Sequence, residues 1–366
     1  MKNIPAILLI LILTAACSSK KDISKADFEP VNDSVPSSAK GVFYHLPRTV
    51  IEVEVTARKV IEKRGPFYRY SRRYLDLSDV ITEDNTYWEI TDASISTTGT
   101  PDPDRLFRIS AKGTPAGAAV SLTPEGTLKG FNLSNQKSMS GKSTDKQNDP
   151  DTTLSTEDIS FDDVPFTEEQ LIKTSSAATA EEVAQEIYNL RDTRRRLLES
   201  DMDNLPPDDG AYNRILHDIS KLEQQYLSLF KGKQEKITQT KTFRFIPEAS
   251  TPIDEVLFRF SKEKGFTDMD DMSGTPVYIE IGNAPVAENR RFSASPDKTR
   301  TGLIYCRPVK ATVQVIDRTV LLNEKEVMIG QFGSLHQLSP ELLDNGKPSI
   351  QLDPKTGAII EIHTNQ

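Results

Sequence analysis

Side chains of the types that most often carry catalysis are few in this sequence, and their spacing does not assemble a site. The four histidines are His45, His217, His336 and His363. None of them stands at a metal-ligand spacing from another histidine or from a cysteine. We find no Gly-x-Ser-x-Gly nucleophile motif and no glycine-rich nucleotide loop. Ser140-Gly-Lys-Ser143 resembles the end of a phosphate-binding loop, but Gln136 stands where that motif needs its first glycine.

Carboxylates are abundant, and two aspartate-rich stretches have the composition of calcium loops. In the first stretch, 201–209, Leu205 and Pro206 occupy positions that need an oxygen ligand and a glycine. In the second stretch, 268–274, Met272 stands at the fifth ligand position. We therefore predict no catalytic residue, no metal and no cofactor. A pair of carboxylates for hydrolysis is assembled only in three dimensions, so the sequence leaves that chemistry open.

Two groups of arginines are the candidates for an interaction surface. The first group lies in an aromatic segment, 65–76, with a predicted short helix, and consists of Arg69, Arg72 and Arg73. The second group lies near the end of a longer predicted helix and consists of Arg191, Arg194, Arg195 and Arg196. The first group suits an anion or a sugar, and the second suits an anionic partner. The wet cationic face of a packed helix is the simpler explanation of the first group, and solvated cations that complement the negative end of a helix dipole are the simpler explanation of the second.

The first 17 residues indicate a targeting signal. Lys2 precedes an apolar run over 4–13 that is too short to span a bilayer, and Thr14-Ala-Ala-Cys17 follows. This site resembles a bacterial lipobox, which implies a lipid on Cys17. Thr14 stands where that motif usually has leucine, so ordinary cleavage to a secreted protein is the alternative. Ser18 resembles outer-membrane sorting signals of Gram-negative bacteria, so we expect a lipid-anchored outer-membrane protein on the periplasmic or cell-surface face.

Composition narrows the class of protein further. A length of 366 residues suits two domains, and a net charge of −9 argues against a nucleic-acid partner, which requires a basic face. Cys17 and Cys306 are the only cysteines, so there is no disulfide framework. We interpret Cys306 as a small buried hydrophobic residue within a strand.

The order of patterns along the chain predicts an α+β fold of six segments. They are a signal segment at 1–17, a flexible tether at 18–40, a first β-rich unit at 41–133, a low-complexity linker at 134–178, an antiparallel helical hairpin at 179–232 and a second β-rich unit at 233–366. We expect the two β-rich units to be sandwich- or barrel-like, with the hairpin inserted between them.

Two short patterns in the first β-rich unit recur in the second. Gly41-x-x-Tyr44-x-x-Pro47 returns as Gly302-x-x-Tyr305-x-x-Pro308, and an alternating apolar strand follows in both places. A strand, a Pro-to-Gly turn and a second strand then occur over 120–128 and over 350–359. The shared order predicts an internal repeat, and chance similarity between hairpins is the alternative.

The helical hairpin carries the clearest periodicity. Thr179 and Glu182 form a capping box at the expected start of the first helix. Apolar residues at four-three spacing follow from Val183 to Leu197, and a Pro-rich turn breaks the helix. A second amphipathic helix begins near Asp208 or Asp209 and ends at 231–232.

Several of these stretches together resemble one known family. They are Gly41 to Val50, the segments around Gly65 and Arg73, Asp203 to Pro206 with Leu222 to Gly232, and Phe258 to Ser261 with Gly274 to Ile281. The chain resembles the uncharacterised Bacteroidota lipoproteins filed as domain of unknown function 4831. The resemblance implies a Bacteroidota envelope protein and no known activity.

We therefore expect a membrane-anchored envelope protein that binds or assembles with another envelope component without catalysis. The tether, the projecting hairpin and the lack of a recognisable set of catalytic residues favour this interpretation. The alternative is a protein that binds or processes glycans, because Tyr44, Tyr70 and Trp88 lie near carboxylates in the sequence.

Overall fold

The computed structural model describes residues 26–31, 41–111, 120–133, 159–199, 209–248, 251–282, 284–287, 302–339 and 348–363. Cys17, the rest of the signal segment and residues 134–158 of the predicted linker lie outside the described residues. The described part is mostly open antiparallel β-sheet with a few helices, which agrees with the α+β class. None of its helices has both the length and the apolar character needed to cross a membrane.

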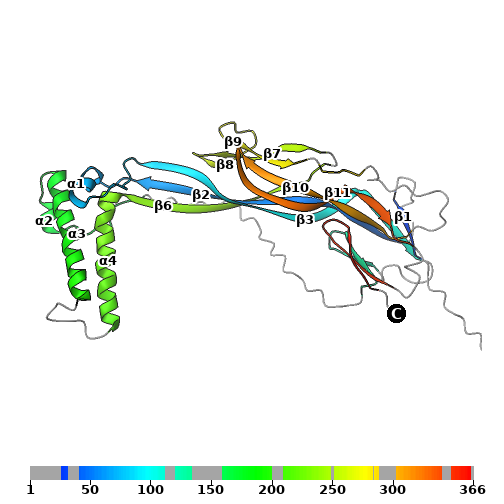
Figure 1. Cartoon of the computed structure of the whole chain (residues 1–366), viewed down its shortest axis with the longest axis horizontal. Helices are drawn as coiled ribbons and strands as arrows, with labels where there is room; N and C mark the ends of the chain where they lie inside the picture. Colours follow the sequence, from blue (N-terminus) through cyan, green and yellow to red (C-terminus); the bar gives the residue numbers. More distant parts are fainter. Residues whose placement is uncertain are drawn as a thin grey trace, which may run out of the picture.

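The first sheet runs along the long axis of the molecule in the order β1-β3-β2-β6 (Figure 1). Its strands are β1 Ala26–Pro30, β2 Val42–Lys63, β3 Asn85–Ala111 and β6 Lys233–Phe245. The alternation predicted for β2 is confirmed, because Ile51, Val53 and Val55 are fully buried while Glu54 between them is exposed. Strand β1 falls inside the predicted flexible tether, so that part of the tether is paired to a sheet.

The second sheet has five strands in the order β11-β10-β9-β7-β8. They are β7 Ile253–Ser261, β8 Gly265–Thr267, β9 Thr275–Ile281, β10 Ile304–Asp317 and β11 Val320–Gln337. It packs on the first sheet through one hydrophobic cluster that contains side chains of both, such as Val53 of β2, Ile279 of β9 and Val313 of β10.

The third sheet joins two short hairpins from distant parts of the chain. Its order is β13-β12-β5-β4, with β4 Val120–Leu122, β5 Leu128–Phe131, β12 Ser349–Leu352 and β13 Ile359–His363. Strand β12 pairs with β5, and β6 pairs with β2. Segments 41–133 and 233–366 therefore share sheets and do not fold as two separate β-rich units.

The helices gather at one end of the molecule, which we call the helical end (Figure 1). It contains the 3₁₀ turn η1 Tyr68–Tyr70, α1 Ser71–Leu75, α2 Glu168–Leu171, α3 Ser176–Leu198 and α4 Asp209–Lys231. Helix α3 starts earlier than predicted, because the Ser175 side chain accepts a hydrogen bond from the Ala178 N–H and takes the cap position assigned to Thr179. Residues 159–178 of the predicted linker are likewise ordered here, with Val164 buried in the helical core.

The echoed sequence patterns occupy matching positions in the hydrogen-bond network. The His45 N–H donates to the carbonyl of Gly126 at 3.0 Å, and the Cys306 N–H donates to the carbonyl of Gly357 at 2.9 Å. Gly126 and Gly357 both have positive φ, at 88° and 76°. Register shifts follow both Tyr-containing segments, between His45 and Pro47 and again between Arg307 and Val309, so both copies carry an irregularity of the β-bulge type.

Candidate interaction surface

Gly65 and Gly232 allow the helical end to pack closely against one end of the first sheet. A Cβ on Gly65 would lie 2.2 Å from the Leu229 carbonyl oxygen, and a Cβ on Gly232 would lie 2.5 Å from the Lys63 carbonyl oxygen. This close approach lets the Phe67 N–H donate to the Leu229 carbonyl at 2.9 Å. Gly232 has a φ of 89° and ends α4 just before β6 begins. The helices therefore continue from the strands through a tightly packed joint.

Helices α3 and α4 lie side by side and cross-connect through polar side chains. The Arg191 Nε donates to the Glu223 Oε1 at 2.7 Å, and the Tyr212 hydroxyl donates to the Leu197 carbonyl at 3.1 Å. Glu223 is almost completely buried, so its carboxylate needs this cationic partner. Within the predicted apolar stripe of α3, Val183 and Ile187 are fully buried, whereas Arg194 is exposed.

The structure brings members of the two predicted arginine groups onto one surface. The Tyr188 hydroxyl of α3 donates to the Tyr74 carbonyl of α1 at 2.8 Å. Arg73 lies over the Tyr74 ring at 5.2 Å, and Arg191 lies over the Tyr188 ring at 5.8 Å. We call Arg73, Tyr74, Tyr188 and Arg191 the arginine–tyrosine strip. Tyr188 is 45% exposed, so part of its side chain is accessible to solvent next to Arg191.

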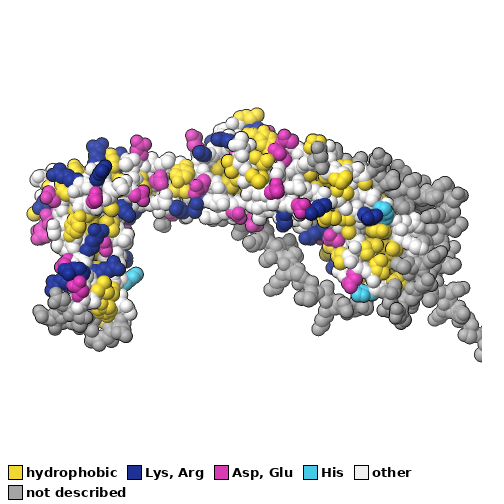
Figure 2. All heavy atoms as spheres, in the orientation of Figure 1, with side chains coloured by type: hydrophobic (Ala, Val, Ile, Leu, Met, Phe, Trp, Pro, Cys, Tyr) yellow, Lys and Arg dark blue, Asp and Glu magenta, His cyan; other side chains and the backbone are white. Residues whose placement is uncertain are grey.

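The remaining arginines of the two groups differ in the partners that they contact. Arg195 forms ion pairs with Asp192 at 2.7 Å and with Glu199 at 3.0 Å, which neutralise it within α3. Arg69 donates to the Tyr68 hydroxyl at 2.9 Å and lies over that ring. Arg194 and Arg196 are exposed on α3. Lys and Arg side chains are spread over the helical end with carboxylates beside them (Figure 2).

The excess positive charge lies on the η1–α1 segment. Among the described residues, no carboxylate forms an ion pair with Arg69, Arg72 or Arg73. Arg72 and Arg73 are both exposed. A carboxylate that reached this segment would therefore not have to displace another carboxylate from these arginines.

Sequence reasoning missed Tyr188 and Glu223, which organise this surface. A signal for Tyr188 was present, because it follows the buried Ile187 and therefore falls on the polar face of the predicted helix. An aromatic residue on that face indicates a contact with another segment of the chain. The pairing of Glu223 with Arg191 depends on how the two helices pack and has no local signal.

The aromatic residues that motivated a glycan platform lie elsewhere. Tyr44 is fully buried and stacks on Phe107 with ring centroids 5.6 Å apart, and Trp88 is 7% exposed in the core between the two large sheets. Tyr70 is half-buried and stacks on Tyr74 at 6.0 Å. These three side chains are separated in the fold and do not form one exposed platform.

An open polar groove lies beside the joint, lined in part by Glu62, Asp84, Asn85 and Lys231. Its carboxylate at Asp84 is already engaged, by Lys63 at 2.7 Å and by the Arg64 N–H at 2.9 Å. The hydrogen bond from Lys63 is the main cause that holds the pKa of Asp84 below its usual range. The described residues contain no cluster of three or more His, Cys, Asp or Glu arranged to hold a metal ion.

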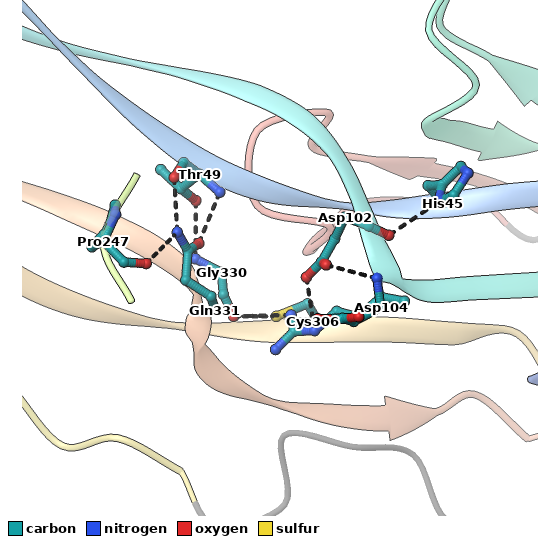
Figure 3. Close-up of polar contacts among 9 residues, drawn as sticks. His45, Thr49, Asp102, Asp104, Pro247, Cys306, Gly330 and Gln331 are labelled. Atoms are coloured by element: carbon teal, nitrogen blue, oxygen red, sulfur yellow. Dashed lines mark hydrogen bonds and ion pairs between the residues drawn. The ribbon is translucent and has the colours of Figure 1, made fainter. Parts of the chain in front are cut away.

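A cluster of polar residues, which we call the buried group, lies where the three sheets meet (Figure 3). The Gln331 Oε1 accepts from the Thr49 N–H at 2.8 Å, and its Nε2 donates to the carbonyls of Thr49 at 2.8 Å and Pro247 at 3.1 Å. The Thr49 hydroxyl donates to the Lys355 carbonyl and accepts from the Gly330 N–H, both at 3.0 Å. These bonds connect β2, β11, the end of β6 and the β12–β13 turn.

Cys306 belongs to this buried group and is poorly suited to nucleophilic chemistry. Its Sγ–H donates to the Gly330 carbonyl at 3.1 Å. Burial raises the pKa of the Cys306 thiol to about 11, against a smaller opposing effect of Arg105. The thiol is therefore protonated at neutral pH, whereas a reactive cysteine is a thiolate. Its predicted role as a small buried residue agrees with this environment.

The buried arginine of the group has its own counter-ion. Arg105 and Asp102 form an ion pair at 3.4 Å, and the side chains are 8% and 11% exposed. Arg105 also donates to the Gly330 carbonyl at 3.3 Å, and His45 Nδ1 donates to the Asp102 carbonyl at 3.0 Å. The cluster thus satisfies its own charges and links strands.

Comparison with known proteins gives one match. Neither the curated proteins nor the solved structures contain a match to this chain. A family model described as Domain of unknown function (DUF4831) matches residues 40–360, which covers most of the chain. The protein therefore belongs to this family of unknown function.

Proposed function

We propose that this protein is a lipid-anchored envelope protein of Bacteroidota type that binds another envelope component without catalysing a reaction. In this proposal Cys17 carries the lipid, and the helical end carries the binding surface. The observation that supports it most directly is the arginine–tyrosine strip, which joins two separate chain segments into one exposed surface.

The chemistry of this surface suits an acidic protein partner. Tyrosine and arginine supply much of the binding energy at protein interfaces, whereas lysine is depleted there. The exposed cations of η1, α1 and α3 are all arginines. The planar guanidinium binds a carboxylate through two parallel hydrogen bonds, and a neighbouring aromatic ring holds it in place.

The other polar groups of the described structure support a binding role. The Cys306 thiol is protonated, and Asp102 is paired with Arg105. Asp84 in the open groove is paired with Lys63. These groups stabilise the fold through bonds they already make.

Crosslinking in intact cells, followed by pull-down through a C-terminal tag and mass spectrometry, tests the proposal. We expect one envelope protein in near-equal amount to the bait, and its loss in a Cys17→Ala variant that is no longer anchored. Arg73→Glu reverses a charge in the strip and should reduce recovery at least tenfold. Arg307→Glu, a matched reversal at an exposed arginine of β10 that forms no ion pair with another described residue, should leave recovery unchanged.

The opposite result has a clear meaning. If no protein is recovered from wild type, or if Arg307→Glu reduces recovery as much as Arg73→Glu does, the helical end is not the binding surface. A screen of the soluble body against glycans would then test the alternative of a glycan-binding or glycan-processing protein.

A further inference from the structure

The two ends of strand β2 have different neighbours. At its first residues, Phe43 pairs with Arg108 of β3, and Arg108 pairs on its other side with Glu29 of β1. At its last residue, Lys63 lies against Gly232 at the joint with the helical end. Strand β2 has 22 residues, so at about 3.3 Å per residue these two ends are about 70 Å apart. Figure 1 shows β1 and the helices at opposite ends of the molecule.

The connection between the two ends is built to resist bending. From Ile51 to Glu62, β2 is paired on one side with β6 and on the other with β3. The outer edge of β3 is covered in part by β11, since Asn323 donates to the Ala93 carbonyl and Lys325 to the Ile95 carbonyl, both at 2.7 Å. The joint at Gly65 and Gly232 then passes this rigidity to α4 without a flexible loop.

The first strand also fixes which end of the molecule stays near the anchor. Strand β1 starts at Ala26, and 26 minus 17 places it nine residues after Cys17. Nine fully extended residues reach at most about 32 Å. A lipid on Cys17 would therefore keep the β1 end within about 32 Å of the anchor. The helical end lies about the length of β2 from the β1 end.

We propose that this protein is a spacer that presents its helical end about 70 Å beyond the anchored end of its sheet. The inference rests on the proposed lipid anchor at Cys17. It specifies the kind of partner, which is an envelope component whose contact surface stands away from the anchoring membrane. A small protein embedded in that membrane next to the anchor would contact the β1 end instead.

Energy transfer from dyes at three heights to a labelled membrane tests the spacer directly. Single cysteines replace exposed residues in Phe43→Cys near β1, Leu321→Cys beside the middle of β3, and Leu198→Cys at the end of α3. The native Cys306 is 1% exposed, and Cys17 is acylated in the purified lipidated chain, so only the introduced thiol reacts. The acceptor dye sits on headgroups of neutral phosphatidylcholine vesicles, which do not attract the arginines.

We expect transfer to fall in the order residue 43, residue 321, residue 198, with several-fold more transfer from residue 43 than from residue 198. Equal transfer from all three positions on vesicles that retain the protein would show that the molecule lies flat, which rejects the spacer and keeps the anchor. If the lipidated chain does not remain with vesicles any better than Cys17→Ala, the anchor and the spacer are both rejected.

Discussion

At the scale of single residues, Gln331 makes hydrogen bonds to two distant segments of the chain, and no local pattern predicts them. Its amide makes three hydrogen bonds, to the Thr49 N–H, the Thr49 carbonyl and the Pro247 carbonyl, at a site where it is 6% exposed. An amide is needed because the site presents both a donor and acceptors. A glutamate would place its carboxylate against two carbonyl oxygens.

We expect Gln331→Met to lower the free energy of unfolding by about 2–4 kcal/mol, because it leaves buried backbone groups without partners. Chemical denaturation of the soluble body measures this loss. Gln239→Met on the exposed face of β6 is the matched control and should change stability by less than about 0.5 kcal/mol. Equal effects of the two substitutions would show that the amide is not a structural link.

Cys306 makes the fold sensitive to alkaline pH. Its pKa rises from 9.0 in the unfolded chain to about 11 in the fold, so the protonated thiol is favoured by folding. This contribution is complete below pH 9 and is lost as the pH rises through 11, by about 2–3 kcal/mol. The stability difference between wild type and Cys306→Ala should shrink by this amount between pH 8.5 and pH 11. A difference that stays constant over that range would contradict the buried thiol.

At the scale of elements, the joint between sheet and helices depends on the absence of a side chain at Gly65. We expect Gly65→Ala to push α4 away from η1 and to speed amide exchange in α3 and α4, with little change in β2 and β10. The control is Gly282→Ala, because a Cβ there meets nothing within 4 Å. Hydrogen exchange measured by mass spectrometry separates the two regions. Uniform destabilisation of sheets and helices would contradict a local joint.

The elements were more predictable than their arrangement. Alternation in β2 and the stripe at Val183 and Ile187 identify buried faces, because each depends on the period of one element. The pairing of β6 with β2 and of β12 with β5 joins residues at least 170 positions apart, and no local pattern encodes it. The same limit applies to the arginine–tyrosine strip, whose two halves meet only when α1 packs on α3.

The two echoed segments make equivalent backbone hydrogen bonds. Their matching backbone bonds, from His45 to Gly126 and from Cys306 to Gly357, support our proposal that the chain contains an internal repeat. The two echoed segments are not separate units, because their small hairpins pair with each other in the third sheet.

At the scale of the whole molecule, the length of the sheet sets the distance between its ends. Duplicating the dipeptides at 60–61, 86–87 and 235–236, which lie at the same level of β2, β3 and β6, keeps the alternation of faces. We expect the maximum dimension from X-ray scattering to grow by about 7 Å, at about 3.3 Å per added residue. Duplicating 60–61 alone should produce a bulge and no growth. Equal dimensions for both variants would contradict a continuous ribbon.

Site-specific photo-crosslinking in cells tests whether the helical end binds the partner. A photoreactive residue replaces Tyr188 on the strip in one strain and Thr312, exposed on β10, in another. We expect one protein to crosslink to position 188 and not to position 312. This crosslinked product should be lost when Cys17→Ala is added. Crosslinking to the same protein from position 312 and none from position 188 would contradict the account.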